Sequence, residues 1–502
     1  MSVPWIAILI LALLYLAYNV LPTLLAPFLT PLRRLPGPSS PSWFWGHLRE
    51  YTHDPGTLPK SWVAKYGHVL KFKLMFNWTT RSQHILAFLL VDFLEKDSFD
   101  DFSLIGVHPK RRVMNPAFGP AQIRGFTDLF FEKSMQLRDI WQSSVQQGDV
   151  NERTQIDILA GLNQMTLDVI GMAGVWTFRL KRITGNDIVN LFCSTGFGYR
   201  FDGLTPSGKN NPLRSALNEI LNPSAFSSRL ALVQAFIPFF RWVPTQRKRK
   251  VLAARQSMLQ IGAEILAEKR AAILTTTENK EKGSISSNSI DGSERDLLTL
   301  LIKANIANDL PENQRLSDDE VIAQIPTFFI AGHETTATAV TWCLFALSIN
   351  VNIQDKLRKE LRAVPTETPT MDELMALPYL DCVLRETLRL YPPVPQVSRQ
   401  ATKDDVIPLN KPYVDTQGKI SHSIHIRAGD HIIISIAAIN QLKKIWGDDA
   451  EEFRPERWNN PPSAAAGIPG VWGNVLTFLG GPRACIGYRF SLVDFPSSGL
   501  RP

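Results

Sequence analysis

The first hydrophobic pattern along the chain is an uncharged run at its amino end. No charged side chain precedes Arg33, and Trp5–Leu21 is almost wholly apolar, with Leu24–Leu29 able to extend it. At a rise of about 1.5 Å per residue, such a helix reaches the short end of what spans a bilayer. The basic pair Arg33 and Arg34 favours retention of the following chain in the cytosol. We therefore predict a membrane anchor over residues 1–32.

Two other interpretations of this run stay open. A cleaved signal peptide would carry a basic amino-terminal region and a small-residue cleavage site, and neither is evident. A buried core helix is rarely the first segment of a chain. Beyond the run, Pro36, Pro38 and Pro41 lie among glycine and serine, a composition that predicts a stiff, non-helical hinge over residues 33–42. Residues 43–502 are predicted to form one catalytic body.

Helical periodicity dominates the first half of that body. Gln122–Gln147 has the pattern of an amphipathic helix. Asn222–Pro244 is rich in apolar side chains and precedes the basic cluster Arg247–Lys250. This pairing suits either the surface of an anionic membrane or a core helix followed by a solvated face. Thr275–Arg295 has almost nothing to bury, which predicts a mobile surface loop.

A long buried helix is predicted after this loop. Ser317–Glu320 is a capping box, with Leu316 and Val321 spaced for a hydrophobic staple, and the helical pattern continues to Asn350. The pattern is apolar nearly all round, which predicts burial in the middle of the molecule. Its centre nevertheless holds Gly332–Thr336, with a glycine, a histidine and a glutamate. Because these residues are costly in a core helix, we expect them to serve chemistry.

Composition narrows the class of protein. Apolar residues make up 44% of the chain and charged residues 20%, which excludes wholesale disorder. The net charge of +7 is small for 502 residues and does not suggest a nucleic-acid-binding protein. Four cysteines are too few for a disulfide scaffold, and no two form the Cys-x-x-Cys pair of a zinc or thioredoxin site. They are Cys193, Cys343, Cys382 and Cys485.

The segment Phe478–Gly487 carries the strongest chemical signal. It reads F-L-G-G-P-R-A-C-I-G, so Cys485 lies between glycines and two residues after Arg483. A single cysteine is most often a buried structural residue. Here the glycines let the backbone approach a flat group closely, and the arginine provides the positive surroundings that a thiolate needs. This arrangement would suit a thiolate that ligates a haem iron, with Arg483 facing a propionate.

The same segment resembles the haem-binding signature of the cytochrome P450 family, F-x-x-G-x-R-x-C-x-G, at every fixed position. Other motifs of that family follow in the proper order. Ala331–Thr335 resembles the oxygen-activation motif, and Glu386–Arg389 resembles the E-x-x-R motif. Phe453–Trp458 resembles the segment whose arginine, here Arg457, completes a Glu–Arg–Arg triad. The anchor and hinge resemble those of microsomal members, and Asn115–Phe118 is similar to fungal ones.

The resemblance implies a fold, a cofactor and a set of site residues. The fold is mainly α with a smaller β-rich region, preceded by one transmembrane helix. The cofactor is haem b (iron protoporphyrin IX), with Cys485 as its metal ligand and Glu334 and Thr335 as the catalytic residues that manage protons. The remaining cofactor-binding residues that it implies are Arg483, Arg399, Arg111, Gly332, Phe478 and Gly487.

Two of the motif assignments can be weighed on the residues themselves. Glu386 and Arg389 are three apart and therefore share one face of a helix, which Pro378 can open and Pro392 can close. Alone, such a pair is usually a weak surface ion pair. For Thr335 the alternative is a hydroxyl that is bonded back to the carbonyl four residues earlier.

The resemblance also implies an activity and partners. It implies a monooxygenase that inserts one oxygen atom from O2 into an apolar small molecule. A secondary metabolite, a terpenoid or steroid-like compound and an aromatic xenobiotic would all fit. Electrons would come from NADPH through a separate cytochrome P450 reductase, and the body would face the cytosol at the endoplasmic reticulum membrane, in contact with lipid. Two alternatives stay open: a haem-thiolate isomerase or peroxygenase, and the inactive product of a damaged gene.

Three features depart from the family pattern. The aromatic position four residues before Arg111 is Val107, which leaves Arg112 as a substitute propionate ligand. Val175–Gly196 is inserted into a segment that is continuous in the sequences of the family. We interpret this insertion as a retained intron. After Cys485 the family continues with a long helix and a hairpin, whereas here Pro496–Gly499 is expected to end the helix early.

Overall fold

The computed structural model describes most of the chain as two compact units. Unit 1 comprises Met1–His108 with Asp381–Cys485, and unit 2 comprises Pro109–Leu380 with Ile486–Pro502. The described residues are 30–42, 45–53, 58–73, 85–88, 111, 115–147, 155–172, 201–205, 211–221, 246–281, 302, 316–366 and 368–499. The predicted single body over 43–502 stays a prediction.

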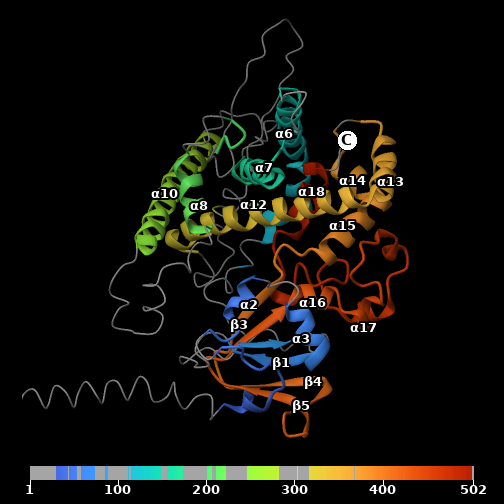
Figure 1. Cartoon of the computed structure of the whole chain (residues 1–502). Helices are drawn as coiled ribbons and strands as arrows, with labels where there is room; N and C mark the ends of the chain where they lie inside the picture. Colours follow the sequence, from blue (N-terminus) through green and yellow to red (C-terminus); the bar gives the residue numbers. More distant parts are fainter. Residues whose placement is uncertain are drawn as a thin grey trace, which may run out of the picture. The chain divides into compact units, whose positions relative to one another are not determined.

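Unit 1 contains the β-rich part of the chain (Figure 1). A four-stranded sheet has the order β1-β2-β6-β3, in which β2 and β6 are parallel and the other neighbours are antiparallel. Two further strands form the antiparallel pair β4–β5. The strands are β1 (Val69–Phe72), β2 (Ile85–Phe88), β3 (Gln396–Gln400), β4 (Asp405–Val414), β5 (Ile420–Ile426) and β6 (His431–Ser435).

Short helices make up much of the rest of the described part of unit 1. The core that they share with the sheet is mainly aliphatic and includes a few aromatic rings, of which those of Trp62 and Phe72 lie 4.9 Å apart between centroids. The helices are η1 (Pro31–Arg34), α2 (Leu48–His53), α3 (Leu58–Tyr66), α15 (Pro378–Leu390), α16 (Ile436–Asn440), α17 (Lys443–Trp446), η8 (Pro455–Asn459), η9 (Ser463–Gly467) and η10 (Gly481–Arg483). The first residues of α15 belong to unit 2.

The predicted hinge is packed onto unit 1. Residues 35–42 of the predicted hinge are non-helical, whereas its first two residues, Arg33 and Arg34, belong to the 3-10 helix η1. Leu32 and Leu35 are buried in a cluster with strand residues, and the Lys71 N–H donates to the Pro36 carbonyl at 2.8 Å. A Cβ on Gly37 would lie 1.8 Å from the Lys71 carbonyl oxygen, so only glycine allows this approach. Residues 1–29 of the predicted anchor lie outside the described residues.

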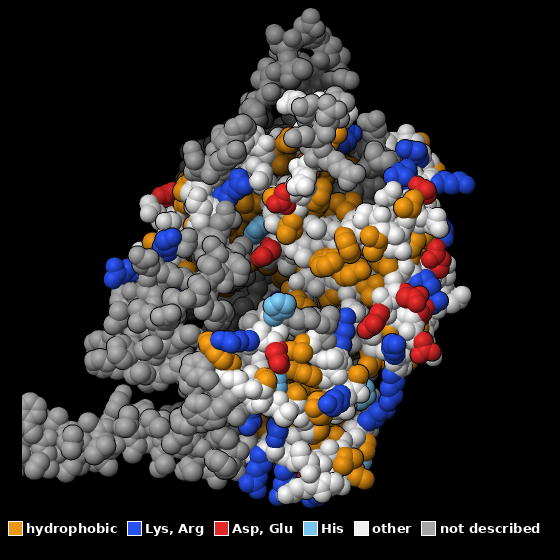
Figure 2. Space-filling view, viewed as in Figure 1, with side chains coloured by type: hydrophobic (Ala, Val, Ile, Leu, Met, Phe, Trp, Pro, Cys, Tyr) orange, Lys and Arg blue, Asp and Glu red, His pale blue; other side chains and the backbone are white. Residues whose placement is uncertain are grey.

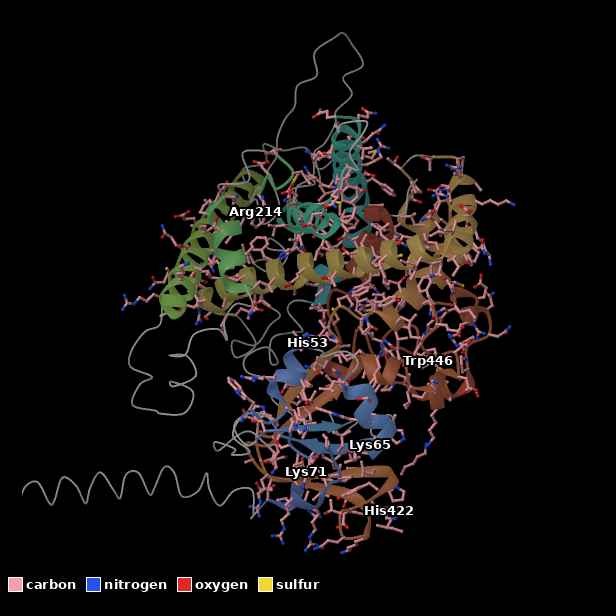
Figure 3. All side chains as sticks on the ribbon, viewed as in Figure 1. His53, Lys65, Lys71, Arg214, His422 and Trp446 are labelled. Carbon is pink, nitrogen blue, oxygen red and sulfur yellow. The ribbon has the colours of Figure 1, made fainter. Side chains whose placement is uncertain are left out.

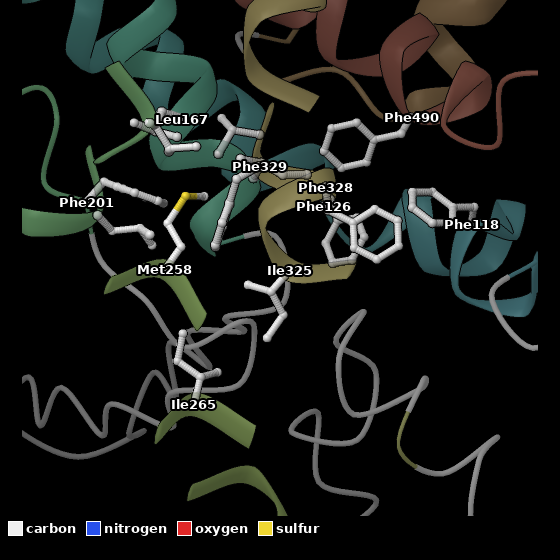
Figure 4. Close-up of a cluster of buried hydrophobic side chains, with 14 of the residues drawn as sticks. Phe118, Phe126, Leu167, Phe201, Met258, Ile265, Ile325, Phe328, Phe329 and Phe490 are labelled. Atoms are coloured by element: carbon white, nitrogen blue, oxygen red, sulfur yellow. The ribbon is translucent and has the colours of Figure 1, made fainter. Parts of the chain in front are cut away.

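Unit 2 is helical in its described part, and its core is built on a long helix, α12 (Figure 4). Phe201 meets Phe329 of α12 edge to face, with centroids 5.0 Å apart, and Phe130 meets Phe490 in the same way at 5.1 Å. The helices are η2 (Asn115–Phe118), α5 (Pro120–Arg124), α6 (Thr127–Gln147), α7 (Ile158–Met172), α8 (Pro212–Leu221), α10 (Gln246–Glu281), α12 (Asp318–Ile349), α13 (Val351–Arg362), α14 (Met371–Met375) and α18 (Tyr488–Gly499).

Helix α12 confirms the predicted start and end. The Ser317 hydroxyl accepts from the Glu320 N–H, and the Glu320 carboxylate accepts from the Ser317 N–H, which completes the capping box. The prediction of burial all round the helix is wrong. Trp342, Phe345 and Ile349 are 41%, 47% and 61% exposed. Hydrophobic pattern shows which faces can be buried, but tertiary partners decide which are.

Three other predicted boundaries need correction. The helix predicted over Gln122–Gln147 is two helices, because the chain turns at Gly125 between α5 and α6. The predicted loop at Thr275–Arg295 begins as helix, since α10 continues to Glu281. The helix extends into these polar residues because its earlier turns are stabilised by packing. Helix α18 continues through Gly499 with Pro496 inside it. Burial of its Phe490 and Val493 outweighs the local propensity of this last turn.

The fold class is confirmed as mostly helical with a small β region. Among the described helices, none is by itself both long and apolar enough to cross a membrane. The bent pair α12 and α13, with 114° between the two helices, meets these criteria of length and composition together.

Candidate active site

A buried ionic network lies at the carboxyl end of α15. The Arg389 guanidinium donates to both oxygens of the Glu386 carboxylate, from Nε and Nη2, at 2.9 Å each. Both side chains are fully buried. Arg389 also donates to the main-chain carbonyls of Asn440, Ala450 and Glu452 at 2.8, 2.6 and 3.2 Å. The predicted pair is therefore a junction between α15 and later segments of unit 1, and not a surface ion pair.

Arg457 joins this network, as predicted, and brings a second carboxylate. Its Nε lies 3.4 Å from Glu386 Oε1, and its Nη1 donates to Asp449 Oδ1 at 2.7 Å. Burial alone would lower the pKa of Arg457, but Asp449 and Glu386 together raise it. The hydrogen bond from Arg457 in turn lowers the pKa of the Asp449 carboxyl. The Trp458 indole donates to Glu386 Oε2 at 3.0 Å, and the ring of Trp446, labelled in Figure 3, lies 5.1 Å from the Arg389 guanidinium carbon.

The cysteine loop is held by its own backbone. The Cys485 N–H donates to the Phe478 carbonyl at 2.8 Å, which closes the turn between them. A Cβ on Gly480 would lie 1.7 Å from the Pro469 carbonyl oxygen, and Gly481 has a φ of +68°. The two glycines are therefore required by close approach and by backbone conformation. Cys485 is exposed at the end of this turn.

Two arginines concentrate positive charge in unit 1. Arg399 lies on β3 and is 6% exposed, and its Nη1 donates to the Ser398 carbonyl at 2.9 Å. Burial lowers the pKa of Arg399, and the positive charge of Arg483 lowers it further. The Nε of Arg483 is buried and has no hydrogen-bond acceptor in the described part of the chain. No acidic side chain among the described residues pairs with either guanidinium, so the two together favour a bound anion.

Within unit 2, the central turn of α12 packs tightly on α7. A Cβ on Gly332 would lie 2.9 Å from the Ile170 side chain. The Thr166 hydroxyl lies 3.0 Å from the His333 carbonyl. Gly332 was predicted to bind cofactor, but the contact that the structure gives it is with α7. Its lack of a side chain lets the two helices approach closely.

The polar residues of this turn differ in their surroundings. Thr335 Oγ1 donates to the Ala331 carbonyl at 2.7 Å, which is the alternative left open from the sequence. Glu334 is exposed. His333 Nδ1 lies 2.5 Å from the Phe329 carbonyl, and because a carbonyl only accepts, Nδ1 carries the proton. Burial lowers the pKa of His333, so its side chain is neutral at pH 7.

Comparison with known proteins identifies the family. The family model described as Cytochrome P450 matches residues 107–495. This chain belongs to the cytochrome P450 family. Cytochrome P450 monooxygenase 205 from Postia placenta is 43% identical over 489 residues, which cover 93% of this chain and 84% of the relative. Cytochrome P450 monooxygenase 128 from the same fungus is 43% identical over 515 residues (98% and 89%). Cytochrome P450 monooxygenase claQ from Ampulloclitocybe clavipes is 31% identical over 495 residues (93% and 84%).

The family implies a haem cofactor, and the residues of unit 1 fit one. A haem presents two anionic propionates and an iron that binds soft thiolate ligands. Arg399 and Arg483 offer two neighbouring guanidiniums without an acidic partner in the described chain. Cys485 offers an exposed sulfur on a turn whose glycines admit a flat group. The donor set thus matches the charge and the metal preference of the P450 cofactor.

The cofactor roles predicted for three further residues stay predictions. Arg111 is described without its neighbours 112–114, so its propionate role and the substitute Arg112 stay predictions. Phe478 is buried and meets Trp472 edge to face at 5.9 Å. Gly487 faces Phe118 in unit 2, where a Cβ would meet the ring at 3.9 Å. The interrupting segment Val175–Gly196 lies outside the described residues.

Sequence reasoning missed several residues of the P450 network. Asp449 neutralises part of the Arg457 charge. Asn440 accepts from the Leu476 N–H, and Thr477 donates to the Leu388 carbonyl, just before the cysteine loop begins. None of them has a helical spacing to its partner, because the partners lie eight or more residues apart in the sequence. Trp458 lies within the predicted motif, and its half-buried indole needs an acceptor. That need is the one signal that could have joined it to Glu386.

Replacement of Gly332 tests the helix contact. Gly332→Ala should destabilise unit 2 by about 1–2 kcal/mol, because the new methyl group clashes with Ile170 by more than the helix gains from alanine. Ile170→Val removes the side-chain atom nearest to that methyl group. The double variant should therefore lose less free energy of unfolding than the sum of the losses in the two single variants, as measured by urea unfolding. Strict additivity would contradict the contact.

Proposed function

We propose that this chain is a haem-thiolate monooxygenase that inserts one oxygen atom from O2 into an apolar small molecule. The observation that carries the proposal is in unit 1, where the exposed Cys485 ends a glycine-shaped turn and the guanidiniums of Arg399 and Arg483 have no acidic partner in the described chain. The named monooxygenase relatives support the same reaction. Haem b, when bound, supplies oxygen activation at its iron.

Each residue of unit 1 has a distinct part in this proposal. Cys485 would ligate the iron as a thiolate and donate electron density to it. Arg399 and Arg483 would bind the propionates through charge-assisted hydrogen bonds. The buried network of Glu386, Arg389 and Arg457 would hold the surrounding segments rigid, since each guanidinium fastens several main-chain carbonyls. The protein thereby orients the cofactor, which carries out the oxidation.

Electrons and substrate come from outside the chain in this proposal. NADPH would supply the electrons through a separate cytochrome P450 reductase, as the family generally uses such a redox partner. The substrate would be a terpenoid, a steroid-like compound, another secondary metabolite or an aromatic xenobiotic. Hydroxylation or epoxidation of such a compound would make it more soluble in water.

We further propose that the amino-terminal run anchors the protein in the endoplasmic reticulum membrane, with the catalytic body in the cytosol. Arg33 and Arg34 directly follow the run and are exposed on η1. The Arg34 carbonyl accepts from the Thr416 N–H, which fixes η1 beside the turn between β4 and β5. Figure 2 shows Lys and Arg side chains gathered over this end of unit 1. Such a basic surface favours contact with anionic lipid.

Glu334 and Thr335 are proposed to manage protons during the reaction. Thr335→Ala should lower product formed per NADPH by about a hundredfold, at the low end of what a proton-transfer group contributes. Thr335→Ser should retain most of it. Thr327→Ala is a matched control, because the Thr327 hydroxyl makes the same bond to a carbonyl one turn earlier on α12. If Thr335→Ala and Thr327→Ala form the same amount of product per NADPH, the proposed role of Thr335 in proton transfer is contradicted.

One experiment separates the proposed reaction from its alternatives. The full chain is reconstituted in lipid vesicles with a fungal reductase and screened against the substrate classes above under labelled O2. A monooxygenase forms product that carries one labelled oxygen, and only when NADPH and reductase are present. Product that forms with peroxide alone, or rearranged product without labelled oxygen, would favour a peroxygenase or an isomerase. A folded chain that retains no haem would favour the inactive product of a damaged gene.

A further inference from the structure

Asn440 is a buried polar residue at the end of α16 that the family motifs do not include. Its side chain is 0% exposed and makes two hydrogen bonds. Oδ1 accepts from the Leu476 N–H at 2.9 Å, and Nδ2 donates to the Thr477 hydroxyl oxygen at 2.9 Å. Both partners lie directly before Phe478, whose carbonyl accepts from the Cys485 N–H. Asn440 therefore fixes the main chain where the cysteine loop begins.

The same residues connect this point to the ionic network. Arg389 Nη1 donates to the Asn440 carbonyl at 2.8 Å. The Thr477 hydroxyl donates to the Leu388 carbonyl at 2.6 Å, on the residue before Arg389. Two separate routes thus run from α15 to the segment Leu476–Phe478, one through the Asn440 main chain and one through Thr477.

The chemistry of the bonds makes these two side chains hard to replace. The Leu388 carbonyl only accepts, so the single Thr477 proton is directed to it. The Thr477 oxygen can then only accept from Asn440, which requires the Asn440 nitrogen on that side and its oxygen toward Leu476. A leucine at 440 would leave the buried Leu476 N–H without an acceptor, although the Thr477 hydroxyl would still donate to the Leu388 carbonyl. A valine at 477 would leave both the Leu388 carbonyl and the Asn440 Nδ2 without that partner.

We propose that Asn440 and Thr477 are positioning residues for Cys485, which transmit the rigidity of the Glu386–Arg389–Arg457 network to the loop that carries the thiolate. This inference rests on the proposed function, because it concerns the placement of a ligand for haem iron. The two residues touch neither iron nor substrate. They fix the position of the backbone at Leu476–Phe478. The hydrogen bond from the Cys485 N–H to the Phe478 carbonyl then fixes the position of Cys485 relative to that backbone.

The test compares Thr477→Val, which keeps shape and loses the hydroxyl, with Thr477→Ser, which keeps the hydroxyl. Hydrogen exchange is followed by mass spectrometry in the full chain as expressed with haem. Exchange in a peptide covering Leu476–Cys485 should accelerate about tenfold in Thr477→Val and remain within about twofold in Thr477→Ser. Asn440→Leu should accelerate it further. Peptides from β4 and β5 should be unchanged, which separates a local effect from global unfolding.

The second readout is spectroscopic. In Thr477→Val the fraction of the reduced carbon monoxide complex with a thiolate-type Soret band should fall, while Thr477→Ser keeps the parent fraction. Equal exchange and equal spectra in the two variants would overturn the proposal. If the parent chain itself shows no thiolate-type band, the proposed function fails. The exchange comparison would still show whether Asn440 and Thr477 hold the loop.

Discussion

Glu386→Gln is expected to destabilise the protein by about 3–5 kcal/mol, the largest stability loss of any single exchange considered. The substitution removes the negative charge that lies between the Arg389 and Arg457 guanidiniums, which are 0% and 2% exposed. It leaves Arg389 as a buried charge without a carboxylate partner among the described residues, and such breakage of a buried pair is strongly destabilising. A loss of this size is comparable to a large fraction of the stability of a typical domain.

Urea unfolding of the Glu386→Gln protein measures this loss. Glu451→Gln is a matched control, because it makes the same chemical change on an exposed side chain nearby. Its effect should stay within about 0.5 kcal/mol. A Glu386→Gln protein that unfolds within about 1 kcal/mol of the parent would show that the carbonyl acceptors around Arg389 alone compensate its charge.

Cys485→Ser is expected to have the largest effect on activity, a loss on the order of a thousandfold or more, as when a residue central to the chemistry is removed. A serine hydroxyl is a harder ligand than a thiolate and does not donate the same electron density to iron. The variant should also lose the thiolate-type Soret band. Product formation with the reconstituted reductase and the absorption spectrum are measured together.

Cys382→Ser provides the control for this exchange. Cys382 is also in unit 1, and its Sγ lies 3.8 Å from Asn459 Oδ1 on η8, in a bond that a hydroxyl can replace. It should keep both the spectrum and the activity. A Cys485→Ser protein that retained a thiolate-type band would move the ligand to another cysteine and refute the assignment.

Local features of this fold could be predicted from the sequence. The capping box at Ser317 and Glu320 depends on residues three apart, and so does the ion pair of Glu386 and Arg389. The glycine-rich turn around Cys485 likewise depends on consecutive residues of the chain. In each case the interacting groups lie within one turn of chain, where spacing fixes geometry.

Long-range features could not be predicted in the same way. Asp449 and Asn440 bond to residues 8 and 36 positions away, at spacings that no helix or strand period produces. The parallel pairing of β2 with β6 joins strands from opposite ends of the chain. The exposure of Trp342 and the extension of α18 past Pro496 depend on packing, which overrides local pattern and propensity.

The central claim, that the Cys485 sulfur ligates haem iron, is tested most directly by one absorption spectrum. The full chain is expressed with its amino-terminal run, isolated in membranes, reduced with dithionite and exposed to carbon monoxide. The proposed site predicts a thiolate-type Soret band that Cys485→Ser abolishes and Cys382→Ser preserves. If hydrogen exchange shows that the protein is folded and the spectrum shows no such band, the claim is contradicted.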